Sequence, residues 1–110
     1  MTVNSSIYGD LADELTIDTS TLTGGYDSIG VLEENPVQIV FDNQSNVAVE
    51  ISNNGTSTWH TFPAGEALVL DMRAAHGIAA NYTFKKGMEF FAQGSAGVGI
   101  FSISYTFARA

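Results

Sequence analysis

The chain contains no cysteine, and this absence removes several kinds of site at once. Without a thiol there is no disulfide, no thiolate metal centre and no cysteine nucleophile. Histidine is nearly as scarce: His60 and His76 are the two in the chain, and they leave little for a transition metal. We therefore expect neither a metal ion nor a cofactor.

Basic residues are also few, with four Lys and Arg against twelve Asp and Glu, so that the formal net charge is -8. This charge repels phosphate, whereas nucleic-acid-binding proteins carry a basic face, so DNA and RNA are poor candidates as partners. Residues 1–34 hold seven of the acids and no base. Solubility alone would account for this acidity, or the acidic segment docks on a basic protein surface.

Long hydrophobic runs are missing as well. No apolar stretch approaches the roughly 18 residues of a membrane span, and residues 1–6 have neither the basic start nor the apolar run of a signal peptide. We expect a soluble protein made in the cytoplasm, without a membrane partner. Charged residues are only 15% of the chain, against about 25% in an average soluble domain. So little charge leaves much neutral surface, which self-association or a larger assembly would cover.

The pattern that is present is alternation of apolar and polar residues with a period of two. It predicts strands over residues 36–42, 46–52, 57–62, 67–73, 88–93 and 99–108. Turn residues separate these segments at 43–46, 53–55, 63–65, 85–87 and 94–99. Strands at about ten-residue spacing indicate an all-β protein, a single antiparallel β-sandwich that is jelly-roll-like with seven or eight strands. Its expected core is Val37, Ile39, Val47, Val49, Ile51, Leu68, Leu70, Phe101, Ile103 and Phe107.

The chain divides by composition into an acidic N-terminal arm or edge strand over residues 1–34 and a β-sandwich core over 35–110. A single helical turn is expected at residues 10–15, and a loop at 74–81. The segment 15–23 either forms an edge strand, with Leu15, Ile17 and Thr19 on one face, or belongs to an extended arm that reaches a neighbouring protein. In the second case the residues that contact the partner are Ile7, Tyr8, Asp10, Leu11, Asp13, Glu14 and Leu15.

No arrangement of residues predicts catalysis. The neighbours of His60 on the same strand face are Thr58 and Phe62, and neither would orient an imidazole. The Gly-x-Ser-x-Gly pattern of a serine nucleophile is missing. Adjacent carboxylates at positions 13–14 and 33–34 would point to opposite faces of a strand, so neither pair flanks a substrate bond. The protein is expected not to be an enzyme.

Aromatic residues offer an alternative function. Small β-sandwiches bind sugars by stacking aromatic rings against them, and Trp59, Tyr82 and Tyr105 could serve in this way. The alternative for Trp59 is packing in the core or at a subunit contact, because aromatic residues dominate both.

The order of the turns resembles that of a group of small virion proteins of tailed bacteriophages. The matching positions are Asn35-Pro36, Asn43 with Asn46, Pro63-Ala64-Gly65, Lys86-Gly87, Gly94 to Gly99, and Tyr105. Many members have an Asp-Gly turn where this chain has residues 53–55. The resemblance implies a non-enzymatic structural protein of the virion, either a capsid decoration (cement) protein or a head–neck connector. Its partners would be the major capsid protein or a neck or tail protein, and copies of itself. The alternative is a carbohydrate- or receptor-binding β-sandwich module at the virion surface.

Overall fold

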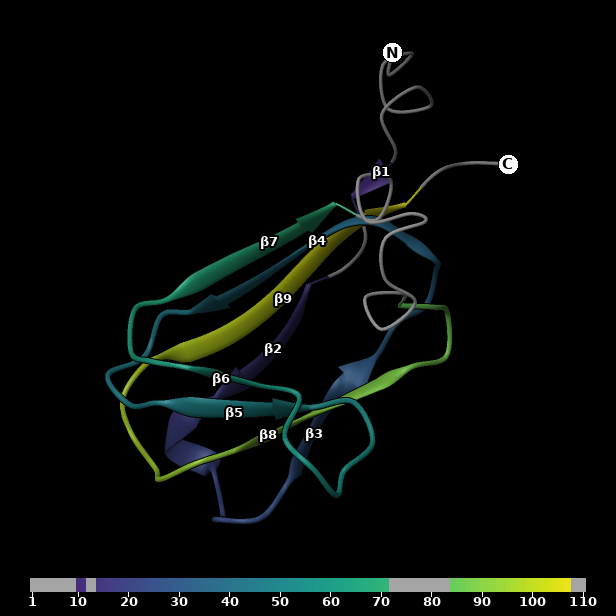
Figure 1. The fold of residues 1–110 in the computed structure, drawn as a ribbon. Coiled ribbons are helices and arrows are strands. Elements are labelled where there is room, and N and C mark those ends of the chain that lie inside the picture. The colour runs from purple at the N-terminus through teal and green to yellow at the C-terminus, as the bar shows by residue number, and fades with distance from the viewer. Residues whose placement is uncertain (1–9, 12–13, 72–83, 108–110) are drawn as a thin grey trace.

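The computed structural model in Figure 1 describes residues 10–11, 14–71 and 84–107. This part of the chain forms two antiparallel β-sheets and one short 3-10 helix, η1 (Thr19–Thr21). Sheet A contains β1 (Asp10–Leu11), β2 (Leu15–Asp18), β4 (Pro36–Asn43), β7 (Ala67–Asp71) and β9 (Ile100–Phe107). Sheet B contains β3 (Asp27–Val31), β5 (Val49–Ser52), β6 (His60–Phe62) and β8 (Glu89–Gln93). The structure thus confirms the all-β prediction.

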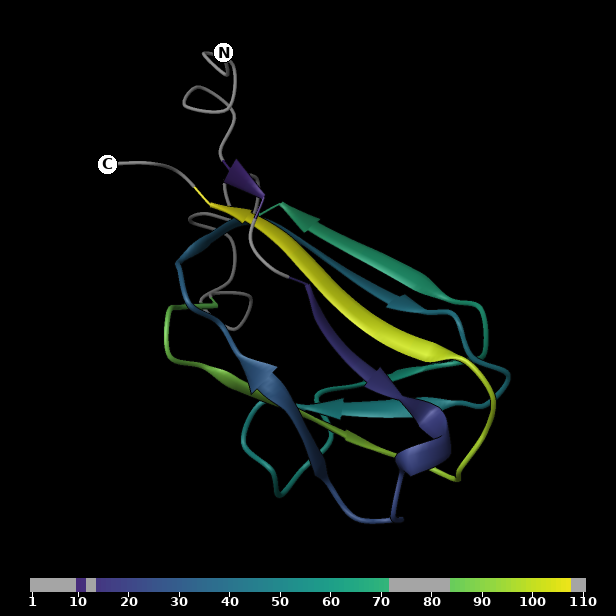
Figure 2. The same ribbon diagram turned by 180° about the vertical axis from the view of Figure 1, so that it is seen from behind.

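In sheet A, β4 lies between β7 and β9. The opposite edge of β9 pairs with β2 at one end, where Leu15 lies across from Ile103, and with β1 at the other end. The five strands therefore follow the lateral order β1 or β2, β9, β4, β7. Figure 2 shows β2 alongside β9.

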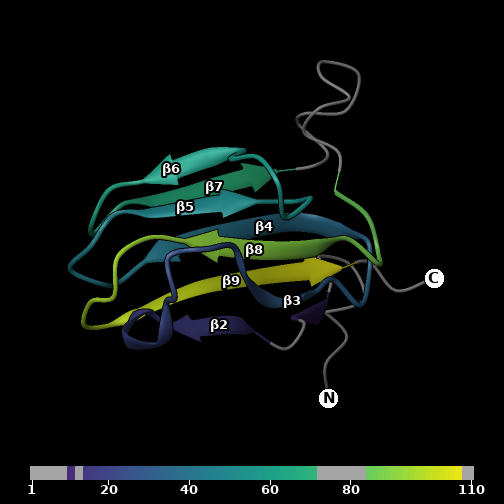
Figure 3. The ribbon, with the colours of Figure 1, turned by 90° about the horizontal axis from the view of Figure 1, so that it is seen from below.

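Sheet B has the order β3-β8-β5-β6 and faces sheet A (Figure 1). Seen from below in Figure 3, the strands of the two sheets run in nearly the same direction, as in aligned sheet packing. The pairing of β3 with β8 contains a register shift between Ser28 and Gly30.

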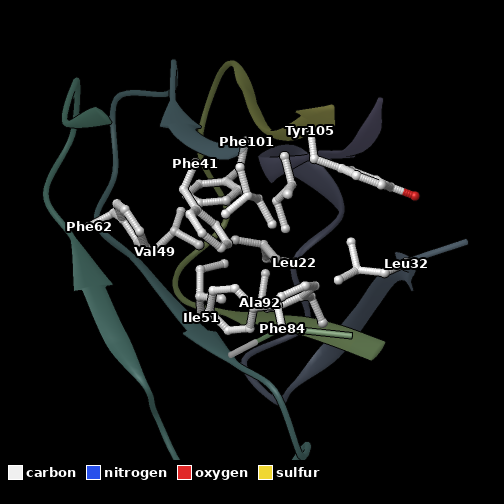
Figure 4. Close-up of a cluster of buried hydrophobic side chains, with 13 residues drawn as sticks. Leu22, Leu32, Phe41, Val49, Ile51, Phe62, Phe84, Ala92, Phe101 and Tyr105 are labelled. Carbon is white, nitrogen blue, oxygen red and sulfur yellow. The ribbon is translucent and has the colours of Figure 1, made fainter. Parts of the chain in front are cut away.

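The core lies between the sheets and draws side chains from both, as Figure 4 shows. Phe41 is at its centre: the ring lies 5.6 Å from that of Phe90 and 5.7 Å from that of Phe62 on the facing sheet. Each fully buried side chain of this size contributes about 1.5–3 kcal/mol relative to exposure. Contacts between residues far apart in sequence therefore stabilise the fold.

The expected core is confirmed for Ile39, Val49, Ile51, Phe101 and Ile103, which are fully buried. At the margin of the cluster, partly buried, lie Val47, Leu68, Leu70 and Phe107. The prediction for Val37 is wrong. The register of β4 against β9 shifts between Pro36 and Gln38, so Val37 falls outside the alternation and outside the buried cluster. Among the described residues, the expected core omitted eight buried hydrophobic ones: Leu22, Leu32, Phe41, Phe62, Phe84, Phe90, Ala92 and Tyr105.

The helical turn expected at residues 10–15 is also wrong. Asp10 and Leu11 pair with β9 as strand β1, and Leu15 begins strand β2. The backbone N–H and C=O groups that pair with a neighbouring strand are not available for hydrogen bonds within a helix. The loop expected at 74–81 lies outside the described residues.

Two predicted turns have the geometry that their glycines suggest. Glu66 donates its N–H to the Pro63 carbonyl at 3.0 Å, and Gly65 has a φ of 82°. A positive φ at the third residue defines a type II turn, for which glycine is preferred. Residues 85–88 repeat this pattern, with Gly87 at a φ of 93°.

Candidate interaction surfaces

The outer face of sheet A is a broad surface of short side chains. Strand register assigns to it Gln38, Val40, Asp42, Ala67, Val69, Asp71, Ile100, Ser102, Ser104, Thr106, Thr16 and Asp18. Ser102 is buried in spite of its place on this face. Val40 is central, with Val69 and Ser104 as its cross-strand neighbours. Val69 is 55% exposed and Ile100 is 46% exposed. Two large aliphatic side chains are thus presented to solvent.

Charge on this face has one sign. Among the residues that the structure describes, it carries Asp18, Asp42 and Asp71 and no Lys or Arg. One oxygen of Asp42 accepts a hydrogen bond from Gln44 Nε2 at 2.7 Å. Docking on this surface would favour a partner with a positive or neutral face.

Asp18 also caps η1, because its Oδ1 accepts the N–H of Ser20 at 2.9 Å. This hydrogen bond to the ionised carboxylate lowers the pKa of Asp18 below its ordinary value of 3.8. A lowered folded-state pKa means that the cap stabilises the fold above pH 3.8, and that this contribution disappears as the pH falls through the lower value.

Seven residues of the N-terminal arm were proposed to contact a partner, and the structure describes four of them. Asp10 and Leu11 form β1, while Leu15 packs against the protein's own core. Glu14 is exposed. The other three, Ile7, Tyr8 and Asp13, lie outside the described residues. The sequence left open whether this segment is an edge strand or part of an arm. Over Leu15–Asp18 it is an edge strand, because β2 pairs with β9.

Two of the three proposed sugar-stacking residues, Trp59 and Tyr105, pack in or against the core. Tyr105 is 2% exposed, and its ring belongs to the core cluster (Figure 4). The Tyr105 hydroxyl accepts the N–H of Glu33 at 2.8 Å. Trp59 is half-buried, 5.2 Å from the Phe41 ring and 5.5 Å from the Phe84 ring between centroids. Trp59 thus has the packing role that was its alternative, and Tyr82 lies outside the described residues.

His60 has a carboxylate neighbour in Glu66. Its Nε2 lies 3.4 Å from Glu66 Oε1, and the two side chains are 40% and 42% exposed. The His60 ring also packs edge-on against Phe62, with centroids 4.4 Å apart. Such an exposed pair contributes little to stability. The second histidine, His76, lies outside the described residues.

A shallow groove of about 600 Å³ opens on another side of the protein. Its walls are Leu22, Thr23, Gly24, Glu50, Gln93, Gly94, Ser95 and Ala96. Glu50 and Gln93 are cross-strand neighbours on β5 and β8. The flanking residues Val49 and Ile51 point into the core, so Glu50 is on the outer face of sheet B.

Neither surface was foreseen from the sequence. The alternation at 99–108 did contain the signal for the outer face of sheet A, because its polar positions are all Ser or Thr. The groove had no local signal, since its walls come from segments 22–24, 50 and 93–96.

The described residues offer neither a metal site nor a membrane-spanning helix. In that part of the chain, no three His, Asp or Glu side chains gather closely enough to hold a metal ion. The same residues include no helix long and apolar enough to cross a membrane.

Comparisons of the chain with protein-family models, with curated proteins and with solved structures found no match.

Proposed function

We propose that the protein is a non-enzymatic structural component of a tailed-phage virion, a capsid decoration (cement) or head–neck protein that docks on other virion proteins. It would be made in the host cytoplasm and reside in the virion. Its partners would be the major capsid protein or a neck or tail protein, together with copies of itself. The resemblance in turn order motivates the choice of virion.

The observation that carries the docking role is the outer face of sheet A. Interface centres are poor in charge and rich in apolar contact area. Val40, Val69 and Ile100 provide that area, and the Ser and Thr side chains around them are short enough for close approach. The carboxylates of Asp18 and Asp42 would then set orientation against a basic partner.

The strand order supports a jelly-roll topology as part of this proposal. Leaving out β1, sheet A reads β2-β9-β4-β7 and sheet B reads β3-β8-β5-β6. Eight strands in two four-stranded sheets are typical of jelly rolls, which occur in viral capsid proteins and in lectins. This is an analogy of fold, and one fold hosts many functions.

An acidic N-terminal arm remains part of the proposal for the residues before β2. Glu14 is exposed, and residues 1–14 contain Asp10, Asp13 and Glu14 with no base. Such a segment would add charge complementarity to a contact made by the outer face of sheet A. Association would then weaken as salt rises, because exposed charges are screened over about 8 Å at physiological ionic strength.

The hydrogen bonding of the polar side chains supports a non-catalytic role. Thr19 Oγ1 donates to the Gly99 carbonyl at 2.9 Å. Asn46 Oδ1 accepts the Val98 N–H at 2.9 Å. Asn54 Oδ1 accepts the N–H groups of Thr56 and Ser57. These groups satisfy backbone atoms in loops, a structural role.

The test compares two substitutions of the same kind, Val69→Lys and Val98→Lys. Val69 lies on the outer face of sheet A, whereas Val98 lies in the loop before β9 and is more exposed, at 74%. Particles purified from cells that produce each variant would be analysed by quantitative mass spectrometry. We expect Val69→Lys to lower the copy number per particle severalfold, and Val98→Lys to leave it unchanged. Equal incorporation of both variants would refute docking through this face, and absence of the wild-type protein from particles would refute the virion role.

A further inference from the structure

The groove described above has a polar wall with a defined hydrogen-bond pattern. Gln93 Nε2 donates to the Gly24 carbonyl at 3.1 Å. A carbonyl only accepts, so this contact fixes which end of the Gln93 amide is nitrogen. Gln93 Oε1 is left as an acceptor without a partner among the described residues.

Glu50 is held by a chain of hydroxyl groups. Thr58 Oγ1 donates to Glu50 Oε1 at 2.8 Å, and Tyr26 Oη lies 2.6 Å from Thr58 Oγ1. Because the single Thr58 hydroxyl proton goes to the carboxylate, the Tyr26 hydroxyl is the donor to Thr58. Glu50 Oε2 then has no partner among the described residues and is the second available acceptor.

The groove thus offers two neighbouring acceptors, one of them charged, and the described residues of its lining include no basic side chain. A metal ion is a poor fit, because Glu50 is the only carboxylate among the described lining residues and Ca²⁺ takes six to eight oxygens. A sugar would need a ring to stack on, and none of the lining residues is aromatic. A cation with several donors fits both the charge and the two acceptors.

We propose that this groove binds the guanidinium group of an arginine side chain on a partner protein. A guanidinium is planar and presents its donors as a rigid fork, which suits two acceptors on adjacent strands. Gly24 and Gly94 have no side chain to obstruct its approach. The net charge of -8 attracts such a partner at long range. This contact is separate from the outer face of sheet A, and either surface can be engaged without the other.

The test uses isotope-labelled protein and a blocked glycine–arginine–glycine peptide, with chemical shifts followed by NMR. A peptide in which citrulline replaces arginine keeps the shape and removes the charge. We expect the arginine peptide to shift the amide signals of Gly24, Glu50, Gln93 and Ser95 and the citrulline peptide to leave them in place.

Two variants that each remove one negative charge would show whether Glu50 makes the contact. Glu50→Gln keeps an acceptor for Thr58 and removes one negative charge, and Glu89→Gln removes one charge from β8 outside the groove. Loss of a charge-assisted hydrogen bond should weaken the arginine peptide about tenfold in Glu50→Gln. Glu89→Gln should bind within about twofold of wild type, since exposed charges interact weakly at a distance. The proposal is overturned if both peptides bind alike, if Glu50→Gln binds as tightly as wild type, or if the shifts lie outside the groove.

Discussion

At the scale of single residues, Asn43 is a fully buried polar side chain that joins three segments of the chain. Its Nδ2 donates to the carbonyls of Val47, Phe62 and Pro63 at 2.9, 3.0 and 3.1 Å. Its Oδ1 accepts the N–H of Ser45 at 3.1 Å. One amide thus ties the end of β4 to the end of β6 and to the loop between β4 and β5.

Replacing Asn43 by Ala should lower the free energy of unfolding by about 3 kcal/mol, because several buried backbone groups lose their partner. Asn53 provides the control: it is half-buried and makes no side-chain hydrogen bond to a described residue. Asn53→Ala should change stability by no more than about 0.5 kcal/mol. Chemical denaturation measures both, and similar losses in the two variants would contradict the role assigned to Asn43.

Trp59 is the residue at which packing and sugar binding make opposite predictions. Trp59→Ala removes ring contacts to Phe41 and Phe84 and should lower the free energy of unfolding by about 2–3 kcal/mol. The wild-type protein should bind nothing on a glycan array. The alternative function, sugar binding, would be supported instead if the wild type bound a glycan and Trp59→Ala lost that binding without a loss of stability.

Residue patterns predicted burial where alternation was regular and failed where it was interrupted. Phe101 and Ile103 follow the alternation of β9 and are fully buried. Val37 has the right residue type, but the bulge beside it breaks the alternation, and a sequence does not mark a bulge. Asn43 was assigned to a polar loop. Its burial depends on carbonyls that approach from β6, which is distant in sequence.

At the scale of elements, Gly→Ala substitutions in the turns measure how much each turn depends on glycine for a positive φ or for close packing. Gly65 has a φ of 82° with nothing within 4 Å of an added Cβ, so Gly65→Ala should cost about 1 kcal/mol through backbone strain alone. At Gly99 the φ is 117° and an added Cβ would lie 2.5 Å from the Gln44 carbonyl oxygen, so Gly99→Ala should cost more than Gly65→Ala. Gly25 has neither constraint, and Gly25→Ala should not destabilise.

Thermal or chemical unfolding of the three variants ranks them. The expected order of stability is Gly25→Ala, then Gly65→Ala, then Gly99→Ala. A Gly65→Ala variant as stable as Gly25→Ala would show that the turn at 63–66 does not need a positive φ.

Turn chemistry and alternation predicted most strands, but the strand pairs were not predictable. Strand β9 pairs with β4 on one edge and with β1 and β2 on the other, and these partners are distant in sequence. The short helix expected at residues 10–15 failed for the same reason, because tertiary pairing with β9 overrides a weak local preference. Neither candidate surface could be assembled before these pairings were known.

At the scale of the whole molecule, the sandwich presents two surfaces of different character. The outer face of sheet A is short-chained and partly aliphatic, whereas the groove by β5 and β8 is polar and carries Glu50. The proposed cement or connector role requires contacts with two neighbours, and these two surfaces would allow them. The low content of charged residues, 15%, accords with burial of part of the surface in an assembly.

The most direct measurement of the central claim is a cryo-electron microscopy reconstruction of the purified particle, at a resolution that shows strands. The account predicts density for this sandwich with the outer face of sheet A against another virion protein and Val69 buried at the contact. A particle that lacks the protein, or one in which this face points to solvent while another surface makes the contact, would contradict it.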